Sequence, residues 1–208
     1  MQDAFVGTWT QEWRLSAEML GSLRDLNHRF LDLTAARSGL WTGSGPAGQV
    51  LHLAGQVAPL SAAQRAAAAG CPYALFDLRF QDDCHWRLRL ESAGPWRIAD
   101  EPMADDDTVN FVRLALFYAW HIASVAGLSA QLLLGMSVDT AKAFRAATVD
   151  SLPSLAVTEA VHLTARWSDC AVYWSALVGA ASAGNPAVLR RVQLHGLQLA
   201  AASRLPYR

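Results

Sequence analysis

The chain has 208 residues, 52% of them hydrophobic, with eight tryptophans and a formal net charge of −1 from 17 basic and 18 acidic residues. This composition predicts a folded protein with a substantial core and argues against disorder. The balanced charge excludes a strong general attraction to nucleic acid and leaves only a local basic patch as a candidate. Three cysteines without a C-x-x-C pair indicate neither a disulfide framework nor a cysteine zinc site.

No basic segment followed by an apolar run occurs at the N-terminus, so no signal peptide is expected. The longest apolar stretch, residues 114–134, is interrupted by polar residues and a glycine. We expect it to form a buried helix followed by a turn, because a membrane span needs an unbroken apolar run. These observations favour a cytoplasmic protein that does not bind membranes.

The chain opens with an arm that carries Trp9 and Trp13. Ser16 is expected to cap a helix that continues to about Arg37, because the apolar residues of this stretch recur at helical spacing. A glycine-rich stretch at 43–48 then predicts a flexible break before the next helix.

Ser61 and Gln64 form the pattern of a capping box, which predicts a helix that ends at Gly70. Residues 73–80 are rich in aromatic side chains and are compatible with a short strand. The proline-containing acidic stretch 94–107 is expected to be a solvated linker. A divalent cation could in principle bind its acids, but the glycine turn of a calcium loop is missing.

Beyond this linker, Thr108 is the expected cap of a long helix, and Ser137 the expected cap of a helix that ends near residue 146. Residues 170–183 are expected to form the next helix. The last helix is expected to start at Pro186 or Ala187, after a Gly-Asn-Pro turn, and to end near Ser203.

Two segments of the chain resemble each other. Residues 60–82 align with 147–169 at a spacing of 87, which places Arg79-Phe-Gln-Asp82 on Arg166-Trp-Ser-Asp169. A helix led by a hydroxyl residue, Ser61 or Thr148, precedes each signature. The repeat predicts a mostly α-helical protein made of two units related by a pseudo-two-fold axis, with possible short strands at 73–80 and 161–167.

The repeat divides the sequence into an arm and first unit at 1–93, a linker at 94–107, and a second unit with a C-terminal helix at 108–208. Within the repeated signature, Arg79 with Asp82 and Arg166 with Asp169 are predicted to form structural ion pairs. The alternative is that both arginines reach a partner or a phosphate group.

A set of small features in the second unit resembles the FlhD family, a subunit of the bacterial flagellar master regulator of transcription. They are Leu134-Gly-Met-Ser137, Ala141, Ala146-Ala-Thr148, Leu155-Ala-Val-Thr158 and Arg166-Trp167. The resemblance covers about half of the chain and includes no catalytic motif. FlhD proteins are single-unit chains that pair as dimers, so the resemblance implies that this chain carries both halves of such a dimer.

No pattern of residues predicts catalysis, a cofactor or a metal ion. The six histidines are scattered, and none lies in H-E-x-x-H or a comparable spacing. Nucleotide-binding glycine motifs and a serine-hydrolase motif are also missing from the sequence. We therefore expect a protein that is not an enzyme.

Candidate contact residues lie at both ends of the chain. Basic residues in the last helix and tail are candidates for contact with the DNA backbone or with a partner. The alternative for them is a solvated face with cations near a helix C-terminus. Tryptophans of the arm are candidates for contact with a protein, because large aromatic residues often anchor interfaces. The candidates are Arg190, Arg191, Arg204, Arg208, Trp9 and Trp13.

These observations lead to one functional expectation with an alternative. We expect a transcriptional regulator of the FlhD type that acts by protein–protein contact, with weak or partner-dependent DNA binding, on flagellar or related genes. The expected partner is a DNA-binding regulator or a competing regulator, and the chain is expected to be a monomeric pseudo-dimer or a homo-oligomer. The alternative is an adaptor or structural component of a bacterial assembly that does not bind DNA.

Overall fold

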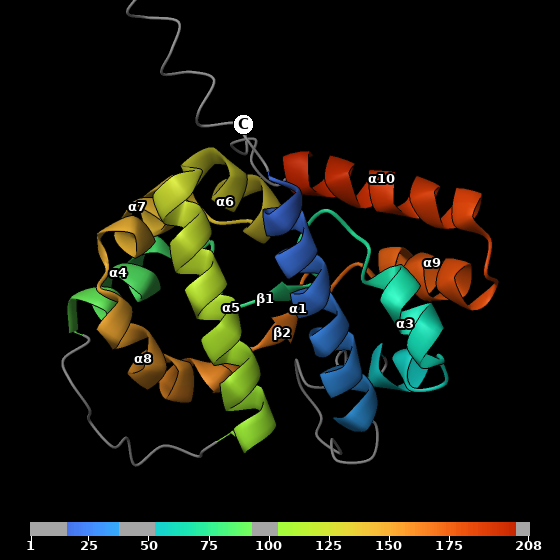
Figure 1. The fold of residues 1–208 in the computed structure, drawn as a ribbon, viewed down its shortest axis with the longest axis horizontal. Helices are drawn as coiled ribbons and strands as arrows, with labels where there is room; N and C mark the ends of the chain where they lie inside the picture. Colours follow the sequence, from blue (N-terminus) through green and yellow to red (C-terminus); the bar gives the residue numbers. More distant parts are fainter. Residues whose placement is uncertain (1–15, 38–52, 93–103, 203–208) are drawn as a thin grey trace, which may run out of the picture. The chain divides into compact units, whose positions relative to one another are not determined.

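The computed structural model describes residues 16–37, 53–92 and 104–202 (Figure 1). Within these ranges the chain is helical apart from turns and one pair of two-residue strands, so the predicted mostly α-helical fold is confirmed. None of the described helices is both long and apolar enough to cross a membrane.

The chain forms two compact units. Unit 1 consists of Met1–Ser22 and Leu78–Leu163, and unit 2 consists of Leu23–Asp77 and Thr164–Arg208. Each compact unit therefore combines segments from both of the units that the repeat predicts. The predicted boundaries describe the order of the sequence, whereas the compact units depend on which segments bury their apolar faces together.

Unit 1 is built from helices. Its elements are α4 (Asp83–Ser92), α5 (Asp106–Val125), α6 (Gly127–Leu134), α7 (Val138–Ala146), the short 3-10 helix η2 (Val149–Ser151), α8 (Leu152–Glu159) and the 3-10 helix η3 (Ala160–His162). Helix α5 packs against α6, α7 and α8, and α4 packs against α7. The rings of Phe80, Trp86 and Phe144 meet with centroid distances of 4.7 to 5.9 Å and form an aromatic core that holds α4 on this unit.

The start of α5 differs from the prediction. Asp105, not Thr108, is the N-cap, and its carboxylate accepts a hydrogen bond from the backbone N–H of Thr108 at 2.9 Å. Asp106 and Asp107 lie in the first turn, so these acids of the predicted linker belong to the helix. They gain stability there because negative charge is favourable at a helix N-terminus.

Two other predicted caps of unit 1 have different outcomes. Ser137 caps α7 as predicted, since its hydroxyl accepts the backbone N–H of Thr140 at 2.9 Å. Thr148 precedes η2 but makes no capping bond with its side chain, so the predicted equivalence of Ser61 and Thr148 as caps is wrong. A 3-10 turn replaces the first turn of the expected helix at this point.

Unit 2 holds the only strands among the described residues. Its elements are α1 (Ala17–Ala36) from Leu23 onward, a helical stretch at 53–57, α3 (Ala62–Ala68), β1 (Phe76–Asp77), β2 (Thr164–Ala165), α9 (Ala171–Ser182) and α10 (Pro186–Ala202). Helix α9 packs against both α3 and α10. The predicted capping box of Ser61 and Gln64 is confirmed, and Ser16 caps α1 by accepting the N–H of Met19 at 3.1 Å.

A buried side-chain amide organises the loop of unit 2 between α3 and β1. Asn27 of α1 is 0% exposed, and its Nδ2 donates to the carbonyls of Ala69, Cys71 and Tyr73 at 2.9 to 3.3 Å. Its Oδ1 accepts the N–H of Leu75 at 2.9 Å. This one side chain therefore satisfies backbone groups that a buried loop would otherwise leave without partners.

The same local features occur twice, 88 positions apart. Arg79 and Trp167 both have a positive φ, 57° and 53°, and are the only described non-glycine residues that do. In each turn, the indole N–H of a tryptophan donates to the backbone carbonyl of the residue eight positions earlier. Trp86 Nε1 donates to the carbonyl of Leu78 at 3.0 Å, and Trp174 Nε1 donates to the carbonyl of Arg166 at 2.9 Å. In this segment the structural register is therefore 88, which corrects the spacing of 87 that the matching arginines suggested.

The two strands pair in a way that follows this register. Phe76 lies opposite Ala165, and Asp77 lies opposite Thr164, in an antiparallel pair. At a spacing of 88, Phe76 corresponds to Thr164 and Asp77 to Ala165. Phe76 therefore lies opposite the counterpart of Asp77, and Asp77 lies opposite the counterpart of Phe76. A local two-fold axis between two equivalent antiparallel strands produces this pairing.

Candidate functional site

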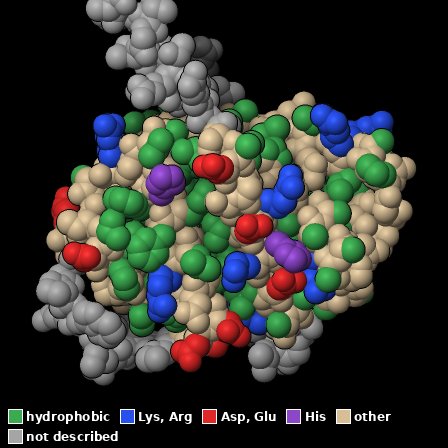
Figure 2. Space-filling model, in the orientation of Figure 1, with side chains coloured by type: hydrophobic (Ala, Val, Ile, Leu, Met, Phe, Trp, Pro, Cys, Tyr) green, Lys and Arg blue, Asp and Glu red, His purple; other side chains and the backbone are tan. Residues whose placement is uncertain are grey.

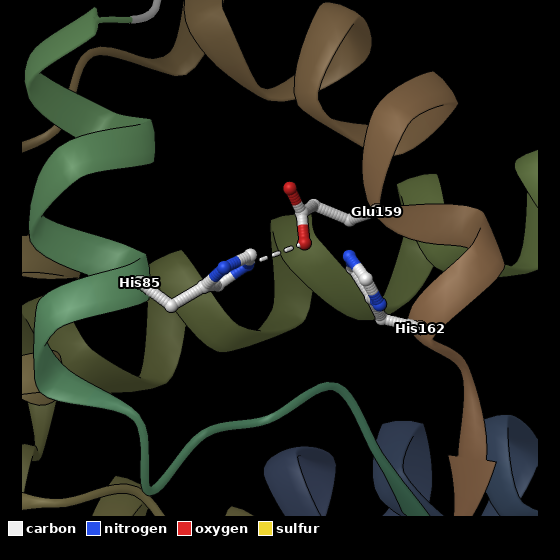
Figure 3. Close-up of side chains that lie close together, drawn as sticks. All are labelled: His85, Glu159 and His162. Carbon is white, nitrogen blue, oxygen red and sulfur yellow. Dashed lines mark hydrogen bonds and ion pairs between the residues drawn. The ribbon is translucent and has the colours of Figure 1, made fainter. Parts of the chain in front are cut away.

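Three side chains of unit 1 converge at one point although they come from distant parts of the sequence. His85 lies on α4, Glu159 is the last residue of α8, and His162 is the last residue of η3. Their ring nitrogens and carboxylate oxygen all lie within 4.8 Å of one another. Figure 3 shows the two imidazole rings on either side of the Glu159 carboxylate.

The carboxylate of Glu159 is completely buried. Its Oε2 lies 2.7 Å from Nε2 of His85, whose side chain is only 11% exposed. Its Oε1 lies 3.0 Å from Nε of Arg89 and forms an ion pair with it, but accepts no hydrogen bond. The buried negative charge is thus held by one hydrogen bond and one ion pair.

The position of His85 is set by the turn that precedes α4. Asp82 accepts the backbone N–H of His85 at 3.0 Å, which is the bond of a helix N-cap, and forms an ion pair with Arg79 at 2.6 Å. These two bonds lower the pKa of Asp82 below its ordinary value, the backbone bond being the larger cause. Trp86, the next residue of the helix, is anchored in the aromatic core, so α4 presents His85 to Glu159 from a fixed position.

The surroundings of the cluster disfavour the charged form of its second histidine, His162. Partial burial lowers the pKa of His162 below its ordinary value of 6.5, because the charged imidazolium loses hydration. The nearby Glu159 opposes this shift, while Arg79, His85 and Arg89 add to it. A neutral imidazole has a free nitrogen lone pair, which is the form that binds metal ions.

The corresponding positions of unit 2 carry other chemistry. At a spacing of 88, His85 corresponds to Tyr173, Glu159 to Cys71 and His162 to Ala74. The hydroxyl groups of Tyr173 and Tyr73 lie 2.9 Å apart, and the thiol of Cys71 lies 3.9 Å from the hydroxyl of Tyr173. Burial raises the pKa of the Cys71 thiol to about 11 and raises the pKa values of both tyrosines, so all three groups remain neutral.

Of the two ion pairs that the sequence predicts, the structure confirms the first. Arg79 and Asp82 form the predicted pair. Arg166 is 6% exposed, its guanidinium lies 4.6 Å from the ring centroid of Trp167, and burial lowers its pKa to about 10. Asp169 is exposed, and its pairing with Arg166 stays a prediction. In the register of 88, Arg166 corresponds to Leu78, so the two arginines of the signature do not occupy equivalent positions.

The predicted contact residues lie partly within the described chain. Arg190 and Arg191 are exposed on α10, and Figure 2 shows basic side chains over this helix with no acidic ones beside them. No acidic residue follows Asp169 in the sequence. The remaining candidates, Trp9, Trp13, Arg204 and Arg208, lie outside the described residues.

The cluster of His85, Glu159 and His162 was not predicted from the sequence, which suggested no metal ligands. One signal was available, because Glu159 and His162 form a Glu-x-x-His pair, a spacing that can place two metal ligands on one side of a helix. The third member lies 74 residues earlier, and only the packing of α4 in unit 1 brings it close.

Comparison of this chain with protein-family models, curated proteins and solved structures found no match. Chemically, the cluster offers two imidazole nitrogens and one carboxylate, a donor set suited to a transition-metal ion. The exposed face of α10 offers positive charge suited to phosphate or to an acidic protein surface.

Proposed function

We propose that this chain is a transcriptional regulator of the FlhD type that acts by protein–protein contact. The observation that supports the proposal is the recurrence of one turn-and-helix unit 88 positions apart, together with a strand pair of two-fold register. FlhD proteins pair as dimers, and a chain with two such units would hold both halves of the dimer in one molecule. A covalent link gives the halves a high effective concentration, so no second chain is required.

In this proposal the basic face of α10 contacts the DNA backbone. Helix α10 buries Gly196 and Ala200 against unit 2 and exposes Arg190, Arg191 and His195. Two arginines neutralise about two phosphates, which predicts a shallow salt dependence with a slope of roughly −2 in log K against log salt. Contact of this size is weak, so a DNA-binding protein partner would supply most of the affinity and the choice of sequence.

The resemblance to FlhD extends the proposal to the control of flagellar or related genes. A regulator of this kind works in the cytoplasm. It would present its surface to a DNA-binding regulator or to a protein that competes for that regulator. The chain itself would be a monomeric pseudo-dimer or a homo-oligomer of such molecules.

A mobility-shift experiment tests the DNA contact. The full chain, alone and with proteins that co-purify from its native host, is mixed with fragmented genomic DNA at low and at raised salt. We expect binding at low salt that weakens by about tenfold in the double variant Arg190→Gln/Arg191→Gln. Lys142→Gln is the matched control, because Lys142 is an exposed cation on α7 of unit 1 that is paired with Asp139.

A second candidate function is an adaptor or structural component that binds no DNA, which the net charge of −1 favours. The same experiment separates the two candidates. Absence of a shift at low salt, with and without the co-purified partner, would overturn the DNA contact and support the adaptor. Equal weakening by Lys142→Gln would show that the contact is not located on α10.

A further inference from the structure

The carboxylate of Glu159 is completely buried beside two imidazole rings and forms a hydrogen bond through only one of its oxygens, Oε2. Loss of hydration makes a buried carboxylate costly unless it is paired, hydrogen-bonded or bound to a metal. Its Oε1 accepts no hydrogen bond, although Arg89 supplies an ion pair there. A partly exposed imidazole, His162, lies on the side of the carboxylate opposite His85 (Figure 3).

We propose that His85, Glu159 and His162 form a binding site for one divalent transition-metal ion, and that Zn²⁺ is the ion it fits best. The donor set of two histidines and one glutamate supplies three of the four ligands of a tetrahedral zinc ion. The fourth position remains open to water or to a ligand from a partner. This site is separate from the proposed function.

The types of donor decide between metal ions. Mg²⁺ and Ca²⁺ prefer shells made of oxygen, so two imidazole nitrogens disfavour them. Imidazole suits zinc, copper, iron and nickel, and the single carboxylate is compatible with each of these ions. No cysteine is among the three residues, which removes the sulfur shell typical of purely structural zinc sites.

The distances require only local side-chain movement. Zinc bonds of about 2.1 Å in a tetrahedron place neighbouring donors about 3.4 Å apart. The donors of the cluster lie within 4.8 Å of one another, and His85 and Glu159 are at 2.7 Å because they are hydrogen-bonded. Metal binding would replace this hydrogen bond and move the two groups apart, while rotation of His162 would shorten the longer distances.

Two arginines lie next to the site and oppose a bound cation. Arg89 is paired with Oε1 and leaves Oε2 toward the rings, whereas Nη1 of Arg79 lies 3.5 Å from Nδ1 of His85. Removing the charge of Arg89 should therefore strengthen metal binding. An ion-pair network with a purely structural role would lose stability in the same variant and would gain no affinity for a metal.

The test is a titration of the full, metal-stripped chain with Zn²⁺, followed by calorimetry and by thermal unfolding. Cys84 is exposed and adjacent to His85, so all proteins carry Cys84→Ser to remove its thiol. The ligand variants are His85→Gln and His162→Gln. The matched control is His121→Gln, because His121 is an exposed histidine on α5 of the same unit. Circular dichroism of each metal-free variant shows that it is folded.

We expect one saturable Zn²⁺ per chain and a higher unfolding midpoint in its presence. Each ligand variant should weaken binding by more than about 100-fold, since even residues that only support a ligand account for about 10–100-fold. His121→Gln should bind as the parent does, and Arg89→Gln should bind more tightly. Absence of saturable binding, or binding that is unchanged in a folded His162→Gln variant, would overturn the proposal.

Discussion

In unit 1, two histidines flank a buried carboxylate, whereas the positions 88 residues away in unit 2 hold Tyr173, Ala74 and Cys71. The backbone around both sets is alike: a residue of positive φ, an indole N–H that closes the turn, and a helix that starts at Asp83 or Ala171. The side chains differ in charge, since unit 1 buries Glu159 beside Arg89 and unit 2 buries neutral hydroxyl and thiol groups. Similar local backbone features thus accompany a set of metal-ligand types in one unit and a neutral hydrogen-bonded network in the other.

The units also differ in how their long helices hold the rest of the unit. Asn27 of α1 binds the backbone of the loop before β1, whereas α5, a helix of equal length, has the buried apolar residue Leu116 at the same position counted from its start. At this position, unit 2 is therefore stabilised by the hydrogen bonds of a buried amide, whereas unit 1 is stabilised by apolar packing. Substitutions can test each side of this contrast.

The largest effect is expected for Asn27→Leu. The change leaves the N–H of Leu75 and several carbonyls buried without partners, which should lower the free energy of unfolding by about 3–5 kcal/mol. Urea unfolding followed by circular dichroism measures it. Asp25→Ala, at an exposed position of the same helix, is the control and should change stability by less than about 0.5 kcal/mol. A loss below about 1 kcal/mol for Asn27→Leu would show that the hydrogen bonds of Asn27 do not stabilise the loop before β1.

A smaller loss is expected for Gly196→Ala in α10. A Cβ at this position would lie 1.9 Å from the hydroxyl oxygen of Tyr73, so the helix or the tyrosine must move. Overpacking of this kind costs about 1–3 kcal/mol, partly offset by the better helix propensity of alanine. Gly179→Ala on α9 is the control, because a Cβ there meets no atom within 4 Å and should be neutral or stabilising. Equal thermal midpoints for the two variants would show that α10 does not pack closely on Tyr73.

The smallest effect concerns the thiols and appears only at alkaline pH. Burial raises the pKa of Cys71 from 9.0 to about 11, so the folded chain keeps a proton that the unfolded chain releases. The free energy of unfolding should therefore fall as pH rises from about 9 to 11, and Cys71→Ala should reduce this fall. Near pH 8 an alkylating reagent should modify exposed Cys84 quickly and Cys71 only on unfolding. Equal rates for the two thiols in the folded chain would contradict the buried network of unit 2.

Local features of the fold were predictable because they depend on neighbouring residues. The caps at Ser16, Ser61 and Ser137 follow from hydroxyl groups next to apolar periodicity, and the structure has all three. The sequence predicts a repeat spacing of 87, because Arg79 and Arg166 are residues of the same type, whereas the backbone conformation of Arg79 matches that of Trp167. A positive φ at a non-glycine residue leaves no mark in the sequence, because it is imposed by surrounding contacts.

The candidate site was less predictable than the helices. Glu159 and His162 are close in sequence and could have been noticed as a pair. His85 joins them only because Asp82 and Trp86 fix α4 within unit 1, and such packing depends on contacts between residues far apart in the chain. The sequence also did not predict which segments form each compact unit, because each compact unit combines segments from both predicted units.

The contrast between the two units is tested most directly by X-ray absorption at the zinc edge of the loaded full chain with its three native cysteines. A site made by His85, Glu159 and His162 predicts a shell of nitrogen and oxygen at about 2.0–2.2 Å, with the outer-shell signature of two imidazole rings. Sulfur at about 2.3 Å would contradict it, because that result would assign the metal to a cysteine such as Cys71 or Cys84 instead of the unit 1 cluster.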